Sequence, residues 1–215
     1  MCRLLLAHNP SGLDPAPHLE AFKALSRNSR EYQGHGWGCA WLDAEGRWQM
    51  YHHINPVWED TRAFPKTSLF LAHARSAFRD EGIMVENNMP FSDGQSVFLF
   101  NGELQGVRIK AEGRIGAEKI FNTIKRFDQG DAAAAVTRGV RVINHRTKRV
   151  RAMNFFLANN QKVQVYSQFD SEPDYFQLQQ CVLGDERVVC SVRYDLGDNS
   201  WQAIPNHHQF EISLT

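Results

Sequence analysis

Three stretches of the chain are apolar at consecutive positions, a pattern typical of strands buried on both faces. Residues 2–7 read CRLLLA, and a turn-rich cluster follows them. Residues 68–77 begin apolar and finish polar, which is the pattern of a buried strand that delivers residues to a site. Residues 97–100 are apolar and stop abruptly at Asn101-Gly102, so we expect a strand end there. Asn-Gly is also the commonest tight-turn signal, and a plain hairpin is the alternative.

Three other segments repeat apolar residues at the spacing of an amphipathic helix. They are residues 17–30, a segment that starts near Gly116, and residues 131–145. The apolar positions that support them are Leu19, Phe22 and Leu25, then Ile120, Phe121, Ile124 and Phe127, then Val136, Val140 and Ile143. Amphipathic helices beside strands buried on both faces require sheets that are covered on two sides.

The remaining pattern is β-like, with a hairpin near the start and a C-terminal third made of strands. A turn at residues 43–46 joins predicted strands at 39–42 and 48–54. The last 65 residues or so predict only strands, at 153–158, 163–169, 175–182, 187–193 and 209–214. The chain has no linker-like segment and no repeat, so residues 1–215 predict one domain, a layered α/β sandwich.

Charge and composition exclude several classes of function. Lys plus Arg and Asp plus Glu both number 24, and this zero net charge removes the electrostatic argument for nucleic acid or an anionic membrane surface. No apolar run is long enough to span a bilayer, and no secretory signal pattern is present. The four cysteines form no CxxC pair, which favours a reducing, cytoplasmic location and argues against a zinc cluster. We expect no metal and no cofactor.

Cys2 is the main candidate for a catalytic nucleophile. Initiator methionine is normally trimmed before a small residue, and trimming would give Cys2 a free α-amine. A free amine titrates near pH ~8, so one residue would carry both a nucleophile and its base. A cysteine that runs into an apolar strand is more often simply buried, and this alternative stands unless the rest of the chain builds a site around Cys2.

Five segments, in order and at approximate spacing, resemble class II glutamine amidotransferases, small stand-alone members of the N-terminal-nucleophile hydrolases. They are Cys2-Arg3-Leu4-Leu5, Gly36-Trp37-Gly38-Cys39-Ala40-Trp41, His73-Ala74-Arg75, Asn87-Asn88-Met89-Pro90-Phe91 and Phe100-Asn101-Gly102-Glu103-Leu104. The segments around Arg187–Ser191 and Trp201–Pro205 also look like the family's tail. The resemblance implies an α+β, four-layer αββα sandwich with two mostly antiparallel sheets between helix layers.

The resemblance also implies roles for individual residues. Cys2 would attack a side-chain amide carbonyl, form a thioester and release ammonia or an amine. Asn101 and the Gly102 N–H would stabilise the oxyanion. Arg75 would bind a substrate α-carboxylate, with His73 and Ser76 beside it. The glycine run before Cys39 would be scaffold.

The chain departs from the family pattern where a substrate ammonium would bind. Gly116 stands where the family usually has Asp, while Glu118 is kept. A buried ammonium without a counter-charge is costly, so we expect Glu118 or Glu112 to take over, a substrate without a free α-ammonium, or lost activity. Met89 and Phe100 replace frequent family histidines. These changes point away from plain glutamine, towards a γ-glutamyl-type or bulkier amide.

Two other functions remain open from the sequence. The first is a non-catalytic or regulatory member of the same fold that binds a small amide. The second is a papain-like enzyme with His73 as base and Asn101 as orienting residue, which the surrounding motifs do not match. As a hydrolase the protein would act alone on a small-molecule amide or pass ammonia to a separate synthase. The sequence leaves the substrate, the acceptor and the oligomeric state undetermined.

Overall fold

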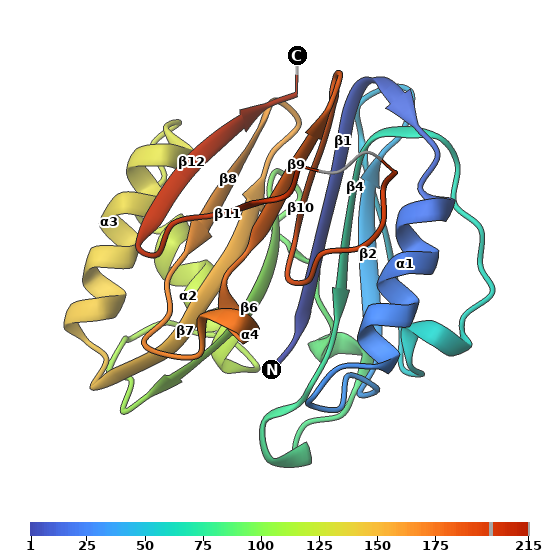
Figure 1. The fold of residues 1–215 in the computed structure, drawn as a ribbon. Coiled ribbons are helices and arrows are strands. Elements are labelled where there is room, and N and C mark those ends of the chain that lie inside the picture. Colours follow the sequence, from blue (N-terminus) through green and yellow to red (C-terminus); the bar gives the residue numbers. More distant parts are fainter. Residues whose placement is uncertain (198–199, 215) are drawn as a thin grey trace.

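The computed structural model describes residues 1–197 and 200–214, and its strands form two sheets that face each other (Figure 1). One sheet has seven strands in the order β11-β9-β10-β1-β4-β2-β3, and the other has five in the order β12-β8-β7-β6-β5. All strand pairs are antiparallel. The strands are β1 (Arg3–Leu13), β2 (Trp37–Leu42), β3 (Trp48–His53), β4 (Thr67–Ala74), β5 (Phe91–Ser92), β6 (Val97–Gln105), β7 (Arg149–Ala158), β8 (Lys162–Ser167), β9 (Gln179–Leu183), β10 (Glu186–Cys190), β11 (Gln202–Ala203) and β12 (His208–Ser213).

Helices cover the outer face of each sheet. The α-helices are α1 (Ala16–Arg27), α2 (Gly116–Lys125), α3 (Ala132–His145) and the short α4 (Pro173–Phe176), and three short 3₁₀ turns are η1 (Val57–Glu59), η2 (Phe78–Asp80) and η3 (Val85–Asn87). Helix α1 lies on the seven-stranded sheet, and α2 and α3 lie on the five-stranded sheet (Figure 1). The predicted four-layer αββα, α+β architecture is therefore confirmed. None of the helices in the described ranges combines the length and apolar character of a membrane span.

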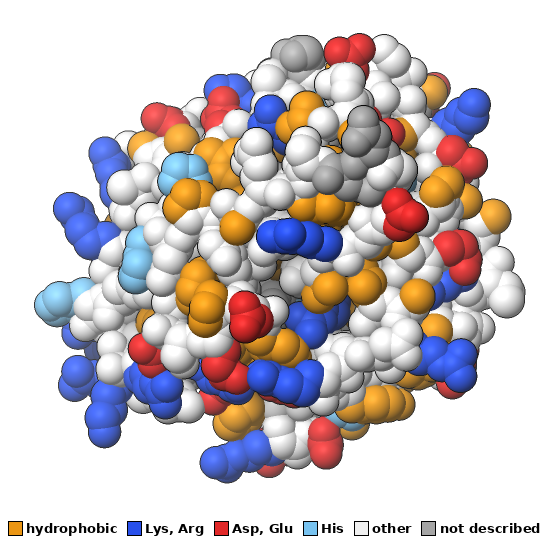
Figure 2. Space-filling view, viewed as in Figure 1, with side chains coloured by type: hydrophobic (Ala, Val, Ile, Leu, Met, Phe, Trp, Pro, Cys, Tyr) orange, Lys and Arg blue, Asp and Glu red, His pale blue; other side chains and the backbone are white. Residues whose placement is uncertain are grey.

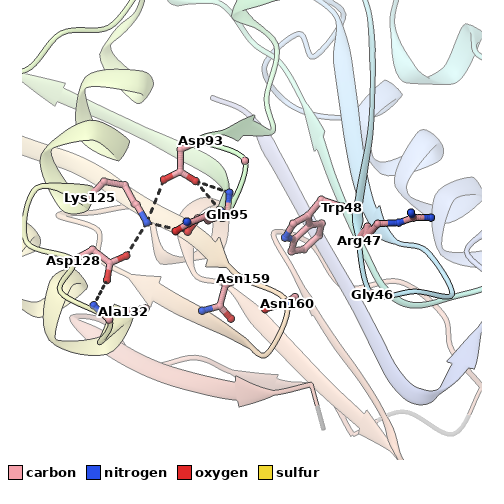
Figure 3. A pocket seen from close by; sticks show the side chains of 13 residues that line it. Gly46, Arg47, Trp48, Asp93, Gln95, Lys125, Asp128, Ala132, Asn159 and Asn160 are labelled. Atoms are coloured by element: carbon pink, nitrogen blue, oxygen red, sulfur yellow. Dashed lines mark hydrogen bonds and ion pairs between the residues drawn. The ribbon is translucent and has the colours of Figure 1, made fainter.

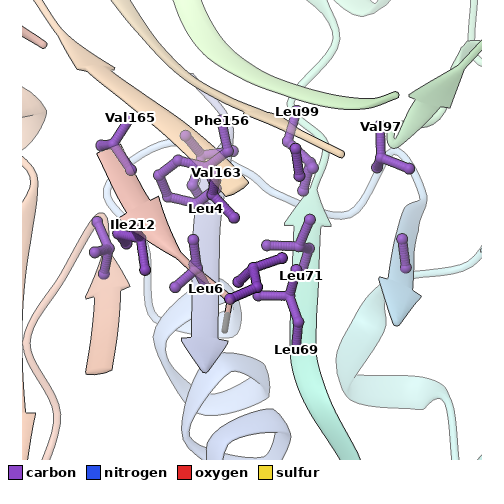
Figure 4. Close-up of a cluster of buried hydrophobic side chains, with 14 of the residues drawn as sticks. Leu4, Leu6, Leu69, Leu71, Val97, Leu99, Phe156, Val163, Val165 and Ile212 are labelled. Atoms are coloured by element: carbon purple, nitrogen blue, oxygen red, sulfur yellow. The ribbon is translucent and has the colours of Figure 1, made fainter. Parts of the chain in front are cut away.

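The main core fills the space between the two sheets. Alternate residues of each strand point inward, because side chains on a strand alternate between its two faces. Leu4 and Leu6 of β1 meet Leu99 of β6 there (Figure 4). Leu5 points the other way and packs with Phe22 of α1. This alternation explains why the strands are apolar throughout: each buries one face against the other sheet and one against a helix.

Two sequence predictions about where strands end were wrong. Strand β1 continues through the predicted turn at residues 8–12 to Leu13, with a register shift between His8 and Leu13 that accommodates the irregular residues. Strand β6 continues through Asn101-Gly102 to Gln105, paired along its whole length with β7, so neither the strand end nor the hairpin is present. The pairing with β7 supplies the hydrogen bonds that a local turn would otherwise provide.

The C-terminal third is not entirely β. Residues 173–176 form α4, and the strand predicted to start at Tyr175 starts at Gln179. Pro173 occupies the first turn of α4, where its missing N–H costs nothing and its fixed φ favours a helix start. The three predicted helices, observed as α1, α2 and α3, and the predicted turn at residues 43–46 are confirmed within a few residues.

Candidate active site

The alternation of side chains along the strands brings Cys2, His73 and Asn101 to one place between the sheets. Each of the three residues lies two positions from a side chain that points inward and therefore points inward itself. These inward side chains are those of Leu4, Leu71 and Leu99. A hydrogen-bond-range contact of 3.2 Å between His73 Nε2 and the Phe100 carbonyl joins β4 to β6 at this level. The site thus forms where β1 begins and β4 ends in one sheet, opposite β6 of the facing sheet.

Cys2 lies immediately before β1, half-buried, with its sulfur against the backbone that follows β4. The Ser76 N–H donates to Cys2 Sγ at 3.4 Å, and Sγ lies 3.7 Å from the Ser76 carbonyl. The residue predicted to bind substrate, Ser76, therefore contacts the Cys2 sulfur through its backbone.

Asn101 is completely buried, yet neither atom of its side-chain amide has a hydrogen-bond partner among the described residues. Its neighbour across the strands, Asn154, is equally buried and has both amide atoms bonded. A buried amide without partners costs roughly 1–3 kcal/mol per group, so such groups are rare in folded proteins. Asn101 is therefore a donor that the fold itself does not use.

Glycine is the only residue type that fits at position 102. A Cβ there would lie 2.3 Å from the Ala152 carbonyl oxygen and 2.5 Å from Phe100 Cζ. Backbone N–H groups two residues apart on a strand point the same way. The Phe100 N–H points away from β7 and donates to Met89 Sδ at 3.2 Å. The Gly102 N–H therefore also points away from β7. Strand β5 pairs with Val97 and Phe98, and no strand in the described part of the chain pairs with this edge of β6 at Gly102.

His73 is fully buried and unsuited to act as a base. Burial, together with the charge of Arg75, lowers the pKa of His73 to about 3, so the ring is neutral at physiological pH. Its Nε2 contacts the Phe100 carbonyl and its Nδ1 has no partner among the described residues. These contacts make His73 a link between the sheets and weigh against the papain-like alternative.

Arg75 is buried beside Cys2, and one of its guanidinium nitrogens makes no hydrogen bond to the described residues. Its Nη2 donates to the Gly82 carbonyl at 2.8 Å, and the Asn87 amide donates to the same oxygen at 2.9 Å. Its Nη1 is buried without a partner among the described residues. Burial lowers the pKa of Arg75, yet a guanidinium stays charged in proteins. A buried cation with a free donor is suited to an anionic group of a ligand.

Gly116 and Glu118 are not brought into this cluster by any contact among the described residues. Gly116 begins α2 and has open space around it, with nothing within 4 Å of an added Cβ. The Glu118 carboxylate is engaged by Arg114, with Nη2 at 2.6 Å and Nε at 3.0 Å. The Arg114 hydrogen bonds lower the pKa of Glu118, which is therefore already paired. Their substrate-binding roles stay predictions.

A network of charged residues that was not predicted from the sequence surrounds the chain start. The Met1 ammonium pairs with Glu31, and Arg151 lies 3.0 Å from Glu103 and 3.6 Å from Glu31. Burial would raise the pKa of Glu103, but hydrogen bonds from Gln105 and Arg151 outweigh it and lower the pKa. Figure 2 shows acidic and basic side chains intermingled around the place where the N-terminus lies in Figure 1. No sequence pattern marks these residues, because they come from four separate segments.

An open cavity of about 830 Å³ lies away from this cluster and contains none of the predicted site residues (Figure 3). It borders the turns at the opposite ends of β2, β6 and β7. Its one lysine, Lys125, is paired with Asp128 at 2.7 Å and with Asp93 at 3.2 Å. Against the effect of burial, hydrogen bonds to the two acids raise the pKa of Lys125. Lys125 in turn lowers the pKa of Asp128, and the backbone N–H groups of Ser96 and Gln95, together with Lys125, lower the pKa of Asp93, so these groups form a structural ion cluster. No group of three or more potential metal ligands occurs in the described ranges.

Comparison with known proteins identifies the fold. No protein-family model matches the chain, and no curated protein matches it in sequence. A solved glutamine aminotransferase class-II domain protein from Silicibacter pomeroyi superposes with a TM-score of 0.67 at 14% identity, over 99% of this chain and 95% of that one. A "predicted glutamine amidotransferase" from Pseudomonas aeruginosa gives 0.60 at 14% identity, over 98% and 96%.

A longer enzyme contains the same unit. Glutamine phosphoribosylpyrophosphate amidotransferase from B. subtilis, solved with ADP and GMP, gives a TM-score of 0.67 at 16% identity. The match covers 100% of this chain and 49% of that one, so the chain spans about half the length of that enzyme. The expectation drawn from the sequence resemblance is confirmed at the level of structure: the chain has the fold of class II glutamine amidotransferase domains.

Proposed function

We propose that the protein hydrolyses a side-chain amide, glutamine or a γ-glutamyl-type amide, with Cys2 as nucleophile once Met1 has been removed. The Cys2 α-amine takes the thiol proton, and the sulfur attacks the amide carbonyl carbon. The tetrahedral intermediate collapses as the C–N bond breaks, and the α-ammonium protonates the leaving nitrogen. Water then hydrolyses the thioester and frees the acid.

The buried, unbonded Asn101 amide is the observation that carries this proposal. An oxyanion needs donors that are already oriented before charge develops, and such donors have no better partner in the free enzyme. Asn101 and the open-edge N–H of Gly102 meet this requirement beside the chain start. The exposed Asn-Gly turn that the sequence alone allowed would not, because water would satisfy its amide.

Arg75 supports an acid-bearing substrate. Its unpartnered Nη1, its burial and its closeness to Cys2 favour a carboxylate held beside the reacting amide. Glu103 lies near the chain start and would balance a substrate α-ammonium in place of the missing aspartate at Gly116. A glutamyl group carries both charges, so these residues fit the acyl half of the substrate.

A glutamine-shaped electrophile tests the proposal directly. The diazo-oxo analogue of norleucine should add once to the processed protein, at Cys2, as measured by intact mass and peptide mapping. The other three cysteines are controls within the chain: all are buried, and burial raises the pKa of each thiol. Cys2→Ala should give no adduct and no turnover. Full activity of Cys2→Ala would refute the mechanism.

A non-catalytic, ligand-binding role is the second candidate, and the pairing of Glu118 with Arg114 is what favours it. With Gly116 uncharged and Glu118 engaged, the family's usual ammonium partner is absent from its position. Alkylation of Cys2 separates the two functions, since a catalytic thiol reacts fast at neutral pH and a structural one does not. Slow alkylation of the processed protein would favour the binding role.

We also propose that residues 1–215 act as a single glutamine amidotransferase type 2-like domain. The protein would work alone as a hydrolase or deliver ammonia to a separate synthase. The free thiols and the need for a reduced Cys2 fit the cytoplasm. Copurification of an ammonia-using enzyme would favour the second arrangement.

A further inference from the structure

Met1 occupies a defined pocket next to the nucleophile. Its side chain is buried, with 9% of its surface exposed, in an apolar cluster formed with Ala152, Phe169, Tyr175 and Phe176. Its ammonium pairs with Glu31, and its carbonyl accepts from Gln33 Nε2 at 2.5 Å. The residue that processing would remove is thus enclosed by apolar walls with a carboxylate at the rim.

The walls of this pocket are held by contacts that do not involve Met1. The Tyr175 ring lies between the guanidinium groups of Arg3 and Arg30, 4.3 and 4.0 Å from its centroid. The Phe169 backbone is bonded on both sides by the Asn206 side chain, at 2.9 and 2.8 Å. Ala152 belongs to the paired strand β7. Removal of Met1 therefore leaves a preformed pocket.

The reaction places the leaving group of the substrate at the mouth of this pocket. The Cys2 α-ammonium protonates the leaving nitrogen, so that nitrogen must come within hydrogen-bond distance of the amine, about 3 Å. Any substituent on the nitrogen then extends into the space beyond the amine, where Met1 was bonded. Ammonia, the leaving group of glutamine, would leave this space unused.

We propose that the Met1 pocket of the processed protein is a leaving-group site, and that the substrate is a γ-glutamyl amide of an apolar primary amine. This inference rests on the proposed function and names its substrate class. The S–C bond forms as the C–N bond breaks, the amine departs with the proton from the α-ammonium, and water releases glutamate from the thioester. The amine product is about the size of a methionine side chain.

Charge at the rim selects among such amines. Without Met1, the Glu31 carboxylate keeps, among the residues that the structure describes, one longer contact of 3.6 Å to Arg151, whose nearer bonds of 3.0 Å go to Glu103 and Glu172. Glu31 is therefore the acid with free capacity. It favours neutral or cationic leaving groups and disfavours amino acids, whose carboxylate would face it.

The test compares four substrates on the processed full-length protein, with removal of Met1 verified by mass. They are glutamine and the γ-glutamyl amides of butylamine, 1,4-diaminobutane and norleucine, with release of glutamate as the readout. We expect kcat/KM for the butylamide to exceed that for glutamine by about tenfold or more, because each buried methylene contributes roughly fourfold. The norleucine amide should be about tenfold or more worse than the butylamide.

Variants connect this preference to the pocket. Ala152→Leu fills the pocket and should lower the ratio of butylamide to glutamine turnover, whereas Ala44→Leu, the same change at an exposed turn, should not alter it. Phe169→Ala enlarges the pocket and should shift the preference to the γ-glutamyl amide of hexylamine. This second variant keeps the test valid if Ala152→Leu does not fold. Glu31→Gln, at a partly exposed side chain, should narrow the gap between the diamine and norleucine amides.

The outcomes separate the two proposals. Hydrolysis of glutamine without hydrolysis of any substituted amide would overturn the leaving-group site and leave the proposed function standing. An unchanged substrate ratio in Ala152→Leu and Phe169→Ala would also overturn it. Failure to hydrolyse any of the four amides, with no adduct on Cys2, would overturn the proposed function and this inference together.

Discussion

Asn101 and Asn154 allow one substitution to be made twice in nearly the same environment. They are register partners on β6 and β7, and both are fully buried. Asn154 donates to the Phe176 carbonyl at 2.7 Å and accepts from the Gln168 N–H at 3.1 Å. Neither amide atom of Asn101 has a partner among the described residues. Leucine has the branched shape of asparagine without its polar atoms, so Asn→Leu tests the polar groups with little change in volume.

The two substitutions should change stability in opposite directions. Asn101→Leu removes two buried unpaired groups, each costing roughly 1–3 kcal/mol, and we expect the free energy of unfolding to rise by about 1–3 kcal/mol after some repacking. Asn154→Leu leaves the Gln168 N–H and the Phe176 carbonyl unpaired, and we expect a fall of about 2–5 kcal/mol. Asn101→Leu should also lower kcat by ~10²–10³, the usual effect of losing one oxyanion donor.

Urea unfolding followed by circular dichroism measures both changes, provided that the m-value stays constant. In a chain of this size each kcal/mol shifts the melting temperature by about 2–4 °C, so calorimetry gives an independent check. Equal destabilisation by the two substitutions would refute the reasoning, because it would mean that the Asn101 amide is satisfied in the folded protein. A stabilised Asn101→Leu variant with unchanged kcat would keep the energetic argument and remove the catalytic role.

Three further predictions concern the neighbours of Asn101. Arg75→Gln should raise KM about 10–100-fold for substrates with a free α-carboxylate, and far less for their methyl esters, because a charge-assisted hydrogen bond contributes ~1.5–3 kcal/mol; equal increases for acid and ester would contradict carboxylate binding. Burial and the charge of Arg75 lower the pKa of His73 in the folded protein to about 3, whereas in the unfolded chain it titrates near pH ~6.5. The free energy of unfolding is therefore highest above pH ~6.5 and falls as the pH drops, by about 2–3 kcal/mol at pH 4.5. His73→Gln should therefore lose less stability than the wild type between pH 7 and 4.5 in urea titrations, and equal losses would show that His73 is not buried neutral. Gly102→Ala should destabilise the fold by roughly 2 kcal/mol or more, since its Cβ would lie 2.3 Å from the Ala152 carbonyl oxygen, whereas Gly116→Ala, in open space, should be neutral or slightly stabilising; similar melting temperatures for the two variants would count against the close contact.

The family-like motifs were visible in the sequence, but their geometry was not. The segment at Asn101-Gly102 looked like a strand end or a hairpin, and both expectations came from the turn preference of Asn-Gly. Strand β6 instead continues because β7 supplies its hydrogen bonds, although the partner of Asn101 there, Asn154, is 53 residues later in the chain. The turn preference of Asn-Gly stabilises the chain less than pairing with β7 does, so the tertiary contacts overrode it. The same pairing buried the Asn101 amide, which makes it a candidate oxyanion donor.

The sequence by itself determined the layers of this protein. Strands apolar at every position beside amphipathic helices can be stable only as sheets covered on both faces, and the parity of Leu4, Leu71 and Leu99 then decides which side chains lie between the sheets. Only the tertiary structure decided what surrounds Cys2. Glu31, Gln33 and Arg151 come from loops and strands with no shared pattern, and charges and amides meet through the packing of distant segments rather than through local spacing. The pocket around Met1 belongs to this second kind of information, because its walls meet only when β7 and α4 pack against the chain start.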